Sequence, residues 1–126
     1  MLESPPMPTP FAAALVDDLM FLSRIREAGR GAGVEVRAVR TVDAVREAVR
    51  EGAGIVLLDL DSPRLPWSDA LAALAAEPSA VTVGFFGHVH AETGQAAAAA
   101  GCTLVLPRSA FVQRLPTLLA DPPRRS

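Results

Sequence analysis

The sequence predicts an α/β fold in which a parallel sheet of five strands lies between two layers of helices. Two observations predict it. Short apolar runs typical of strands alternate with longer stretches whose apolar residues recur every three or four positions, as on one face of a helix. Most of the strand-like runs are apolar throughout, which is typical of strands that helices cover on both faces.

The first half of the chain has the order strand, helix, strand, helix. The apolar run 11–16 ends at two aspartates, and an apolar stripe over 19–28 predicts a helix that ends in a glycine-rich segment. Residues 34–39 alternate between apolar and charged or small side chains, as in a half-exposed strand near a sheet edge. Thr41 can cap the helix predicted over 42–50.

The second half repeats this alternation three times. Pro116 is expected to break or kink the last helix, because proline has no N–H to donate to the preceding turn. Together with right-handed crossovers, the pattern favours the flavodoxin-like doubly wound strand order 2-1-3-4-5, with the half-exposed second strand at one edge. The strands are predicted over 55–58, 80–86 and 103–107, and the helices over 69–77, 91–100 and 110–119.

Residues 11–120 are predicted to form one domain. We expect the proline-rich leader 1–10 to be disordered and residues 121–126 to form a polar tail. Because the chain ends soon after the last predicted helix, we expect the domain to stand alone.

The composition excludes several classes of function. A formal net charge of −2 and scattered basic residues argue against direct nucleic-acid binding. No apolar run approaches the ~20 residues that span a bilayer, and the N-terminus lacks the features of a secretory signal, so we expect a cytoplasmic protein without membrane contact. All 12 basic residues are arginine, which excludes any mechanism that needs a lysine.

Four aspartates follow two of the predicted strands. Asp17 and Asp18 follow the first strand, and Asp59 and Asp61 follow the third. Because the carboxyl ends of parallel strands meet at one edge of the sheet, we expect these carboxylates to share a crevice with the residues after Phe86. Like charges in a small space cost free energy unless a cation or a proton offsets them.

Three segments carry a resemblance to a known family: residues 16–18 (Val-Asp-Asp) with the helix after them, residues 58–63 (Leu-Asp-Leu-Asp-Ser-Pro) and residues 98–102 (Ala-Ala-Ala-Gly-Cys). In them the chain resembles the receiver domain of response regulators in two-component signalling, over nearly all of 11–119.

The resemblance implies roles for three aspartates. Asp17, Asp18 and Asp59 match the residues that bind Mg²⁺ in the family, and we expect them to bind it weakly. Asp59 matches the residue that accepts a phosphoryl group from a histidine kinase.

Two positions depart from the family's pattern. The hydroxyl residue expected at the end of the fourth strand falls on Phe86, and the lysine expected at the end of the fifth falls on Arg108. Phe86 cannot donate a hydrogen bond to a phosphoryl oxygen, and the planar guanidinium of Arg108 differs from an ammonium in shape and reach. The resemblance is therefore to a degenerate pseudo-receiver that acts through protein contacts and whose phosphorylation switch is impaired. A homodimer through the fourth helix, fifth strand and fifth helix is one such contact.

Three other functions stay open. The chain could be a phosphorylation-competent receiver in a phosphorelay, a metal-free protein interaction module, or a phosphohydrolase with Asp59 as nucleophile and Asp61 as acid or base. The hydrolase needs a phosphate-positioning lysine and a longer chain after the motif, so we expect no enzyme. His88 and His90 could join a metal site only with a third ligand, and we interpret them as part of a solvated loop.

Overall fold

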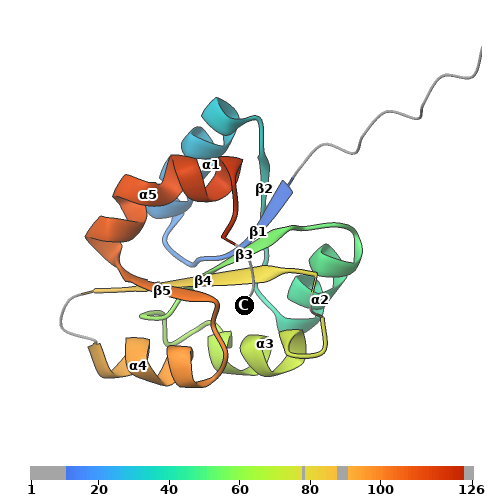
Figure 1. The fold of residues 1–126 in the computed structure, drawn as a ribbon, viewed down its shortest axis with the longest axis vertical. Helices are drawn as coiled ribbons and strands as arrows, with labels where there is room; N and C mark the ends of the chain where they lie inside the picture. Colours follow the sequence, from blue (N-terminus) through green and yellow to red (C-terminus); the bar gives the residue numbers. More distant parts are fainter. Residues whose placement is uncertain (1–10, 78, 88–90, 124–126) are drawn as a thin grey trace, which may run out of the picture.

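The computed structural model describes residues 11–77, 79–87 and 91–123, which form five strands and five helices (Figure 1). The strands are β1 (Phe11–Leu15), β2 (Glu35–Ala38), β3 (Ile55–Asp59), β4 (Val81–Phe86) and β5 (Leu104–Pro107). The helices are α1 (Leu19–Ala32), α2 (Val42–Arg50), α3 (Trp67–Leu74), α4 (Ala91–Ala99) and α5 (Arg108–Ala120). This order confirms the predicted alternation of strands and helices.

The sheet has the topology that the sequence predicts. Its strand order is β2-β1-β3-β4-β5 and every pair of neighbours is parallel, which confirms the doubly wound, flavodoxin-like arrangement. β3 lies at the centre, where Ile55 pairs with Ala12 of β1 and with Val81 of β4. β2 lies at an edge, with Glu35 exposed and Val36 buried, as its alternating pattern indicates.

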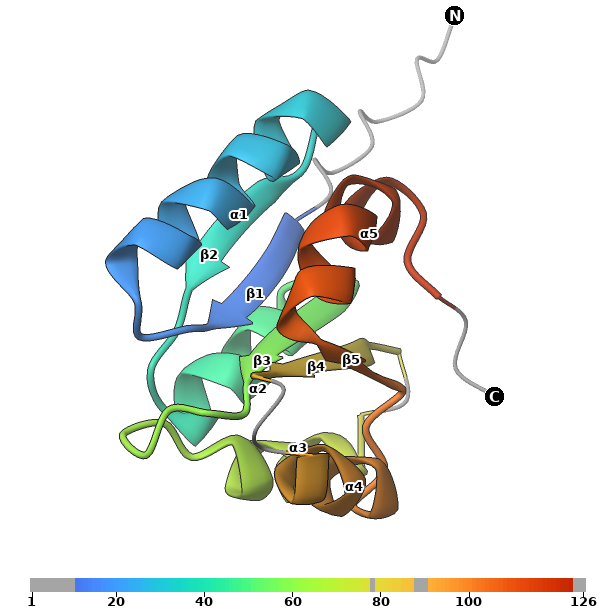
Figure 2. The ribbon, with the colours of Figure 1, turned by 90° about the vertical axis from the view of Figure 1, so that its left-hand side faces the viewer.

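Among the described helices, α1 and α5 cover one face of the sheet, and α2, α3 and α4 cover the other (Figures 1 and 2). The α1–α5 side contains three aromatic rings in mutual contact, Phe21, Phe85 and Phe111, whose centroids lie 4.4 to 6.0 Å apart. β3 contributes to both cores, because Leu57 points into one and Leu58 into the other. Burial on both faces explains why this strand is apolar until its last residue.

α1 is longer than the sequence analysis predicted. It does not end near residue 28 but continues through Gly29 and Gly31, and it ends at Gly33, whose φ of 72° is left-handed. A β carbon at Gly29 would lie 2.5 Å from the carbonyl oxygen of Val34. Gly29 therefore lets α1 approach the start of β2 closely, and Gly33 ends the helix.

α5 also differs from its prediction. It begins at Arg108, directly after β5, and Pro116 does not break it. Leu115, Leu118 and Leu119, which flank the proline, are buried. Burial of such side chains stabilises a fold by about 1.5–3 kcal/mol each, so together they outweigh the cost of about 3 kcal/mol for a proline inside a helix.

One further helix differs from its prediction at its end, and two predicted segments lie partly or wholly outside the described residues. α3 ends at Leu74, before the predicted end at residue 77. The predicted leader 1–10 lies outside the described residues, as does 124–126 of the predicted tail. Over the described ranges, no helix combines the length and the apolar character needed to cross a membrane.

We expect Gly29→Ala to lower the free energy of unfolding by about 1–3 kcal/mol, because the new methyl group meets backbone that cannot move aside. Gly31→Ala is the matched control, since nothing lies within 4 Å of its β carbon. It should stabilise the protein by up to about 1 kcal/mol through helix propensity. Urea unfolding of both variants measures the difference, and an equal effect of the two substitutions would contradict the close approach of α1 and β2.

Candidate functional site

β3 places Asp59 at the carboxyl edge of the sheet, where the residue is only 4% exposed. Its Oδ1 accepts a hydrogen bond of 3.0 Å from the backbone N–H of Asp61. Burial raises the pKa of the Asp59 carboxyl, and the nearby Asp61 charge acts in the same direction, while the positive charge of Arg108 opposes them. Asp59 is thus a sheltered carboxyl group with a cation in its surroundings, at the position that the sequence predicts.

Asp61 connects two loops across the edge of the sheet. Its Oδ2 accepts a hydrogen bond of 2.6 Å from the backbone N–H of Gly87, which follows β4. The carboxylate therefore holds the start of the loop after β3 against the end of β4. The sequence places Asp61 in the crevice but does not reveal this structural contact.

Asp18 is the N-cap of α1. Its Oδ1 accepts hydrogen bonds from the backbone N–H groups of Met20, at 3.0 Å, and Phe21, at 3.1 Å. These bonds satisfy donors that the first turn of a helix leaves without partners. Because Asp18 caps the first turn, α1 can begin directly after it, only a few residues after the end of β1.

Asp17 lies between two arginine side chains. One of its carboxylate oxygens is 3.0 Å from Arg40 and the other is 3.7 Å from Arg64. Both arginines are largely exposed, so each pair contributes little to stability. The pairs nevertheless direct the carboxylate of Asp17 toward guanidinium groups.

The three residues that the resemblance assigns to Mg²⁺ are thus held by different partners. Mg²⁺ takes oxygen ligands arranged closely around one point. Among residues 11–77, 79–87 and 91–123, no group of three or more acidic, histidine or cysteine side chains could hold a metal ion. His88 and His90 lie outside the described residues. As arranged, Asp17, Asp18 and Asp59 do not fit a shared cation, and their binding of Mg²⁺ stays a prediction.

Phe86, at the end of β4, packs inward against α4. A β carbon at Gly94 of α4 would lie 2.7 Å from the Cε1 atom of the Phe86 ring, so the ring occupies the space that this glycine leaves. Phe86 is half-buried and belongs to the apolar core on the α2–α4 side of the sheet. An aromatic ring therefore fills the position where the family's pattern has a hydroxyl.

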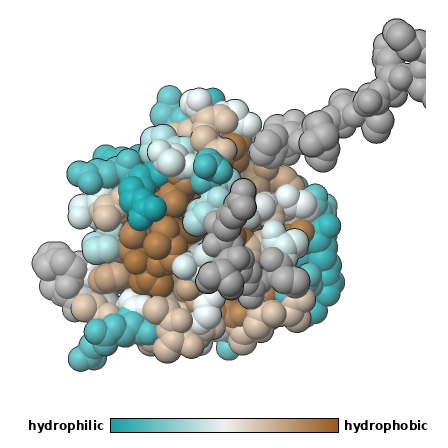
Figure 3. Space-filling model, viewed as in Figure 1, coloured by the Kyte–Doolittle hydropathy of each residue, from teal (hydrophilic) through white to brown (hydrophobic). Residues whose placement is uncertain are grey.

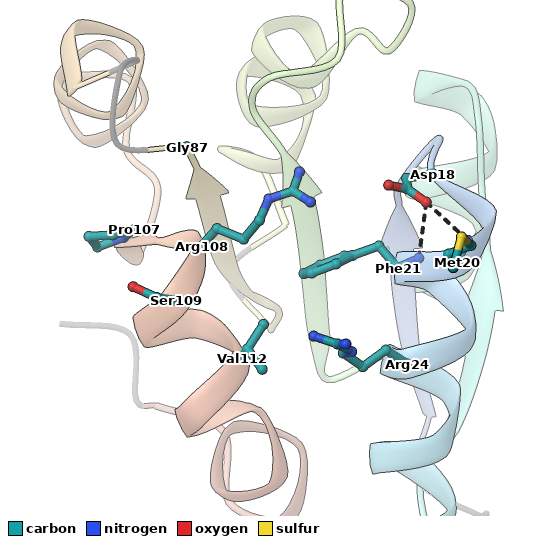
Figure 4. A pocket seen from close by; sticks show the side chains of 9 residues that line it. All are labelled: Asp18, Met20, Phe21, Arg24, Gly87, Pro107, Arg108, Ser109 and Val112. Carbon is teal, nitrogen blue, oxygen red and sulfur yellow. Dashed lines mark hydrogen bonds between the residues drawn. The ribbon is translucent and has the colours of Figure 1, made fainter.

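Arg108 is the first residue of α5, and its guanidinium lies over two aromatic rings. The guanidinium carbon is 4.5 Å from the centroid of Phe21 and 5.6 Å from that of Phe85. Such cation–π contacts favour one orientation of the side chain. Figure 4 shows Arg108 reaching from the start of α5 toward α1 and Asp18.

A cavity of about 750 Å³ opens beside Arg108, between the N-terminal ends of α1 and α5 (Figure 4). The amino-acid sequence gives no indication of this cavity. Its walls come from two helices far apart in the chain, and no local pattern indicates that they adjoin. The lining residues are Asp18, Met20, Phe21, Arg24, Gly87, Pro107, Arg108, Ser109 and Val112.

The edge strand β5 carries apolar surface. Leu104 and Val105 are only half-buried. The strand follows α4 and precedes α5 in the chain, and it lies at the edge of the sheet. On the face where β5 lies, Figure 3 shows an apolar band beneath α5. This band belongs to the face formed by α4, β5 and α5.

No protein-family model matches the sequence, and no curated protein matches it. Several solved structures have the same fold. A receiver domain from Clostridium thermocellum is 18% identical, with a TM-score of 0.72 over 90% of this chain and 93% of that one. A receiver protein from Burkholderia phymatum is 20% identical, with a TM-score of 0.68 over 87% of this chain and 94% of that one.

A third similar structure holds ligands. It is a response regulator from Burkholderia pseudomallei with a phosphorylated aspartic acid, a calcium ion and citrate. It is 19% identical, with a TM-score of 0.70 over 89% of this chain and 67% of that one. The chain described here therefore has the fold of response-regulator receiver domains.

We expect Asp59→Asn to raise the free energy of unfolding at pH 7. The pKa of Asp59 is raised in the folded protein, so the folded state binds more protons than the unfolded state as pH rises past the ordinary aspartate value of 3.8. Wild-type stability must therefore fall over that range, and the advantage of the amide should disappear below it. Asn keeps an oxygen that can accept the hydrogen bond from Asp61.

The measurement is thermal or urea unfolding of both proteins from about pH 3 to pH 7. Asp43→Asn, at an exposed position in the first turn of α2, gives the effect of the same chemical change without burial. If the wild type gains stability relative to Asp59→Asn as pH rises, the raised pKa is wrong.

Proposed function

We propose that this chain is a receiver-like signalling domain that acts through contacts with other proteins, and that phosphorylation at Asp59 switches it poorly. The observation that carries the proposal is the ring of Phe86, which packs against Gly94 at the end of β4. The likeness to receiver structures supports Asp59 as the phosphoacceptor position, because Asp59 is the last residue of β3 at the carboxyl edge of the sheet.

The position of Phe86 weakens any phosphorylation switch. A ligand shifts a protein between two states only if it interacts differently with each of them. A hydroxyl at the end of β4 could bond to a phosphoryl group in one state and not in the other. The Phe86 ring has no donor, and its contact with Gly94 holds it against α4 whether or not Asp59 is modified.

Arg108 supports the alternative of a phosphorylation-competent receiver. Its charge already acts on the carboxyl group of Asp59, as the pKa of that group reflects. A guanidinium can bind phosphate oxygens in pairs. The contacts of Arg108 with Phe21 and Phe85 would have to be given up, at least partly, for it to follow a phosphoryl group as the family's lysine does.

The α4–β5–α5 face is the proposed contact surface. Leu104 and Val105 on the edge strand β5 are half-buried, and an edge strand also presents unpaired backbone groups. A second copy of this chain or a signalling protein such as a histidine kinase is the expected partner. The proposal assigns no catalytic turnover to Asp59 and Asp61, since the chain has no lysine to position a phosphate.

A metal-free interaction module is the second candidate function, and the ion pairs of Asp17 favour it. We expect Mg²⁺ to bind only at millimolar concentration or above, because the ion must displace Arg40 and Arg64 from Asp17. Arg40→Gln should tighten binding severalfold by releasing this carboxylate. Amide chemical shifts of Asp59 and its neighbours, followed during a MgCl₂ titration, measure both affinities.

Arg37→Gln is the control for that titration, since it removes another exposed ion pair, with Glu51, on the second strand. It should leave the Mg²⁺ affinity unchanged. An absence of any shift change around Asp59 in both wild type and Arg40→Gln would end the metal hypothesis and favour the metal-free module.

The switch itself is tested with acetyl phosphate as the phosphodonor. Wild type, Asp59→Asn and the double variant Phe86→Thr/Arg108→Lys are treated, and mass spectrometry records whether Asp59 is modified. Self-association, measured by sedimentation, and hydrogen exchange of the α4–β5–α5 face are then compared with and without the donor. We expect less than about a twofold change in wild type and a clear change in the double variant, which restores the family's hydroxyl and lysine.

A tenfold or larger change in wild-type self-association on phosphorylation, about 1.4 kcal/mol of coupling, would show a working switch. Arg108→Gln in the same assay then identifies whether the guanidinium replaces the lysine. Asp59→Asn, which cannot be phosphorylated there, controls for effects of the donor elsewhere.

A further inference from the structure

The cavity between α1 and α5 combines two arginine side chains with apolar walls. Arg24 reaches across from α1 toward α5, and Arg108 reaches from α5 toward α1 (Figure 4). Phe21 lies between them, and Val112 of α5 faces them from the other wall (Figure 4). With a volume of about 750 Å³, the cavity has the size of ordinary small-molecule sites.

Arg108 lies near the buried carboxyl group of Asp59, on which its charge acts, but without a salt-bridge contact among those found. Other arginines of the protein, Arg30, Arg37 and Arg40 among them, form ion pairs with acidic side chains. The salt bridges found among the described residues involve Arg30, Arg37, Arg40, Arg50 and Arg64, and not Arg24 or Arg108.

Asp18 is the acidic residue that lines the cavity, and one of its oxygens caps α1. The lining therefore carries two positive charges against one negative charge. Because the charge of Arg108 also acts on Asp59, the excess positive charge lies on the Arg24 side of the cavity. Such a local excess of positive charge attracts an anion.

The rest of the lining suits an apolar body. The apolar walls consist of Phe21, Pro107 and Val112. Met20 also lines the cavity, and its side chain is 85% exposed. Met20 and its neighbour Leu19, which is 77% exposed, are the large apolar side chains that the fold leaves in solvent among the described residues. A flexible, exposed methionine can adapt to the shape of a bound apolar group.

We propose that this cavity binds a small amphipathic anion: an aromatic or aliphatic body that carries one carboxylate, phosphate or sulfonate group. Arg24 holds the acidic group, Arg108 adds positive charge on the other side of the Phe21 ring, and Met20, Phe21 and Val112 contact the body. Charge complementarity and a volume of about 750 Å³ favour a small molecule over a protein surface. The inference does not rest on phosphorylation of Asp59. Arg108 belongs to both proposals, but the test below changes Arg24 and Val112, which have no part in the proposed switch.

The test compares two probes with the same aromatic body. 8-Anilinonaphthalene-1-sulfonate carries an anionic group, and N-phenyl-1-naphthylamine lacks it. Fluorescence titration of the folded wild-type protein should show binding of the sulfonate at least about tenfold tighter than binding of the neutral probe. Chemical shifts on addition of the sulfonate should move at Met20, Phe21 and Val112.

Arg24→Gln should weaken sulfonate binding about fivefold to tenfold and leave the neutral probe unaffected, because it removes a charge-assisted contact. Arg26→Gln is the matched control, since Arg26 is exposed on the same helix but does not line the cavity. Val112→Glu should abolish binding of the sulfonate by placing a negative charge in the wall.

The proposal is overturned if both probes bind equally, if Arg24→Gln and Arg26→Gln lose affinity equally, or if the shift changes lie outside the cavity. Circular dichroism of each variant confirms that it is folded, since apolar probes also bind unfolded chains. Failure of this test leaves the signalling proposal intact, because the phosphodonor assay reads self-association and not binding in the cavity.

Discussion

Burial of β3 on both faces is the constraint on which the rest of the structure depends. All five residues of the strand are buried, so two separate cores hold it in place, and its last residue, Asp59, emerges with little freedom. A carboxylate in that position loses water without gaining full compensation, as its raised pKa shows. The backbone N–H of Asp61, the charge of Arg108 and the backbone N–H of Ser62 compensate in part.

The aspartates around this edge each have a structural task. Asp18 caps α1, Asp17 lies between Arg40 and Arg64, and Asp61 connects the β3 loop to Gly87. The acidic side chains therefore reduce their mutual repulsion through separate partners instead of one shared cation. This distribution of partners is the physical basis for expecting Mg²⁺ to bind weakly.

Arg108, at the position where the resemblance predicts a lysine, connects the surroundings of Asp59 to the cavity. An ammonium is a compact charge on a flexible chain, whereas a planar guanidinium can stack on aromatic rings. Arg108 does so over Phe21 and Phe85, and this places its charge at the wall of the cavity as well as near Asp59. Phe86 is also held in one place, because its ring fills the space beside Gly94. A small hydroxyl residue at this position would have room to move.

The sequence by itself determined the order of elements and the position of Asp59, because hydrophobic periodicity and strand ends are local properties of the chain. It also determined the strand order, because right-handed crossovers and a half-exposed second strand leave few arrangements. It did not determine where α1 and α5 begin and end. Gly29 was predicted to end the helix, but it lies inside α1 and allows close packing against Val34. Pro116 was predicted to break α5, but burial of the leucines around it offsets the cost of the proline. Only the tertiary structure decided which partners the aspartates bind and that α1 and α5 enclose a cavity with Arg24 and Arg108 in its walls. These features depend on distances between residues far apart in the sequence, and no local pattern encodes such distances.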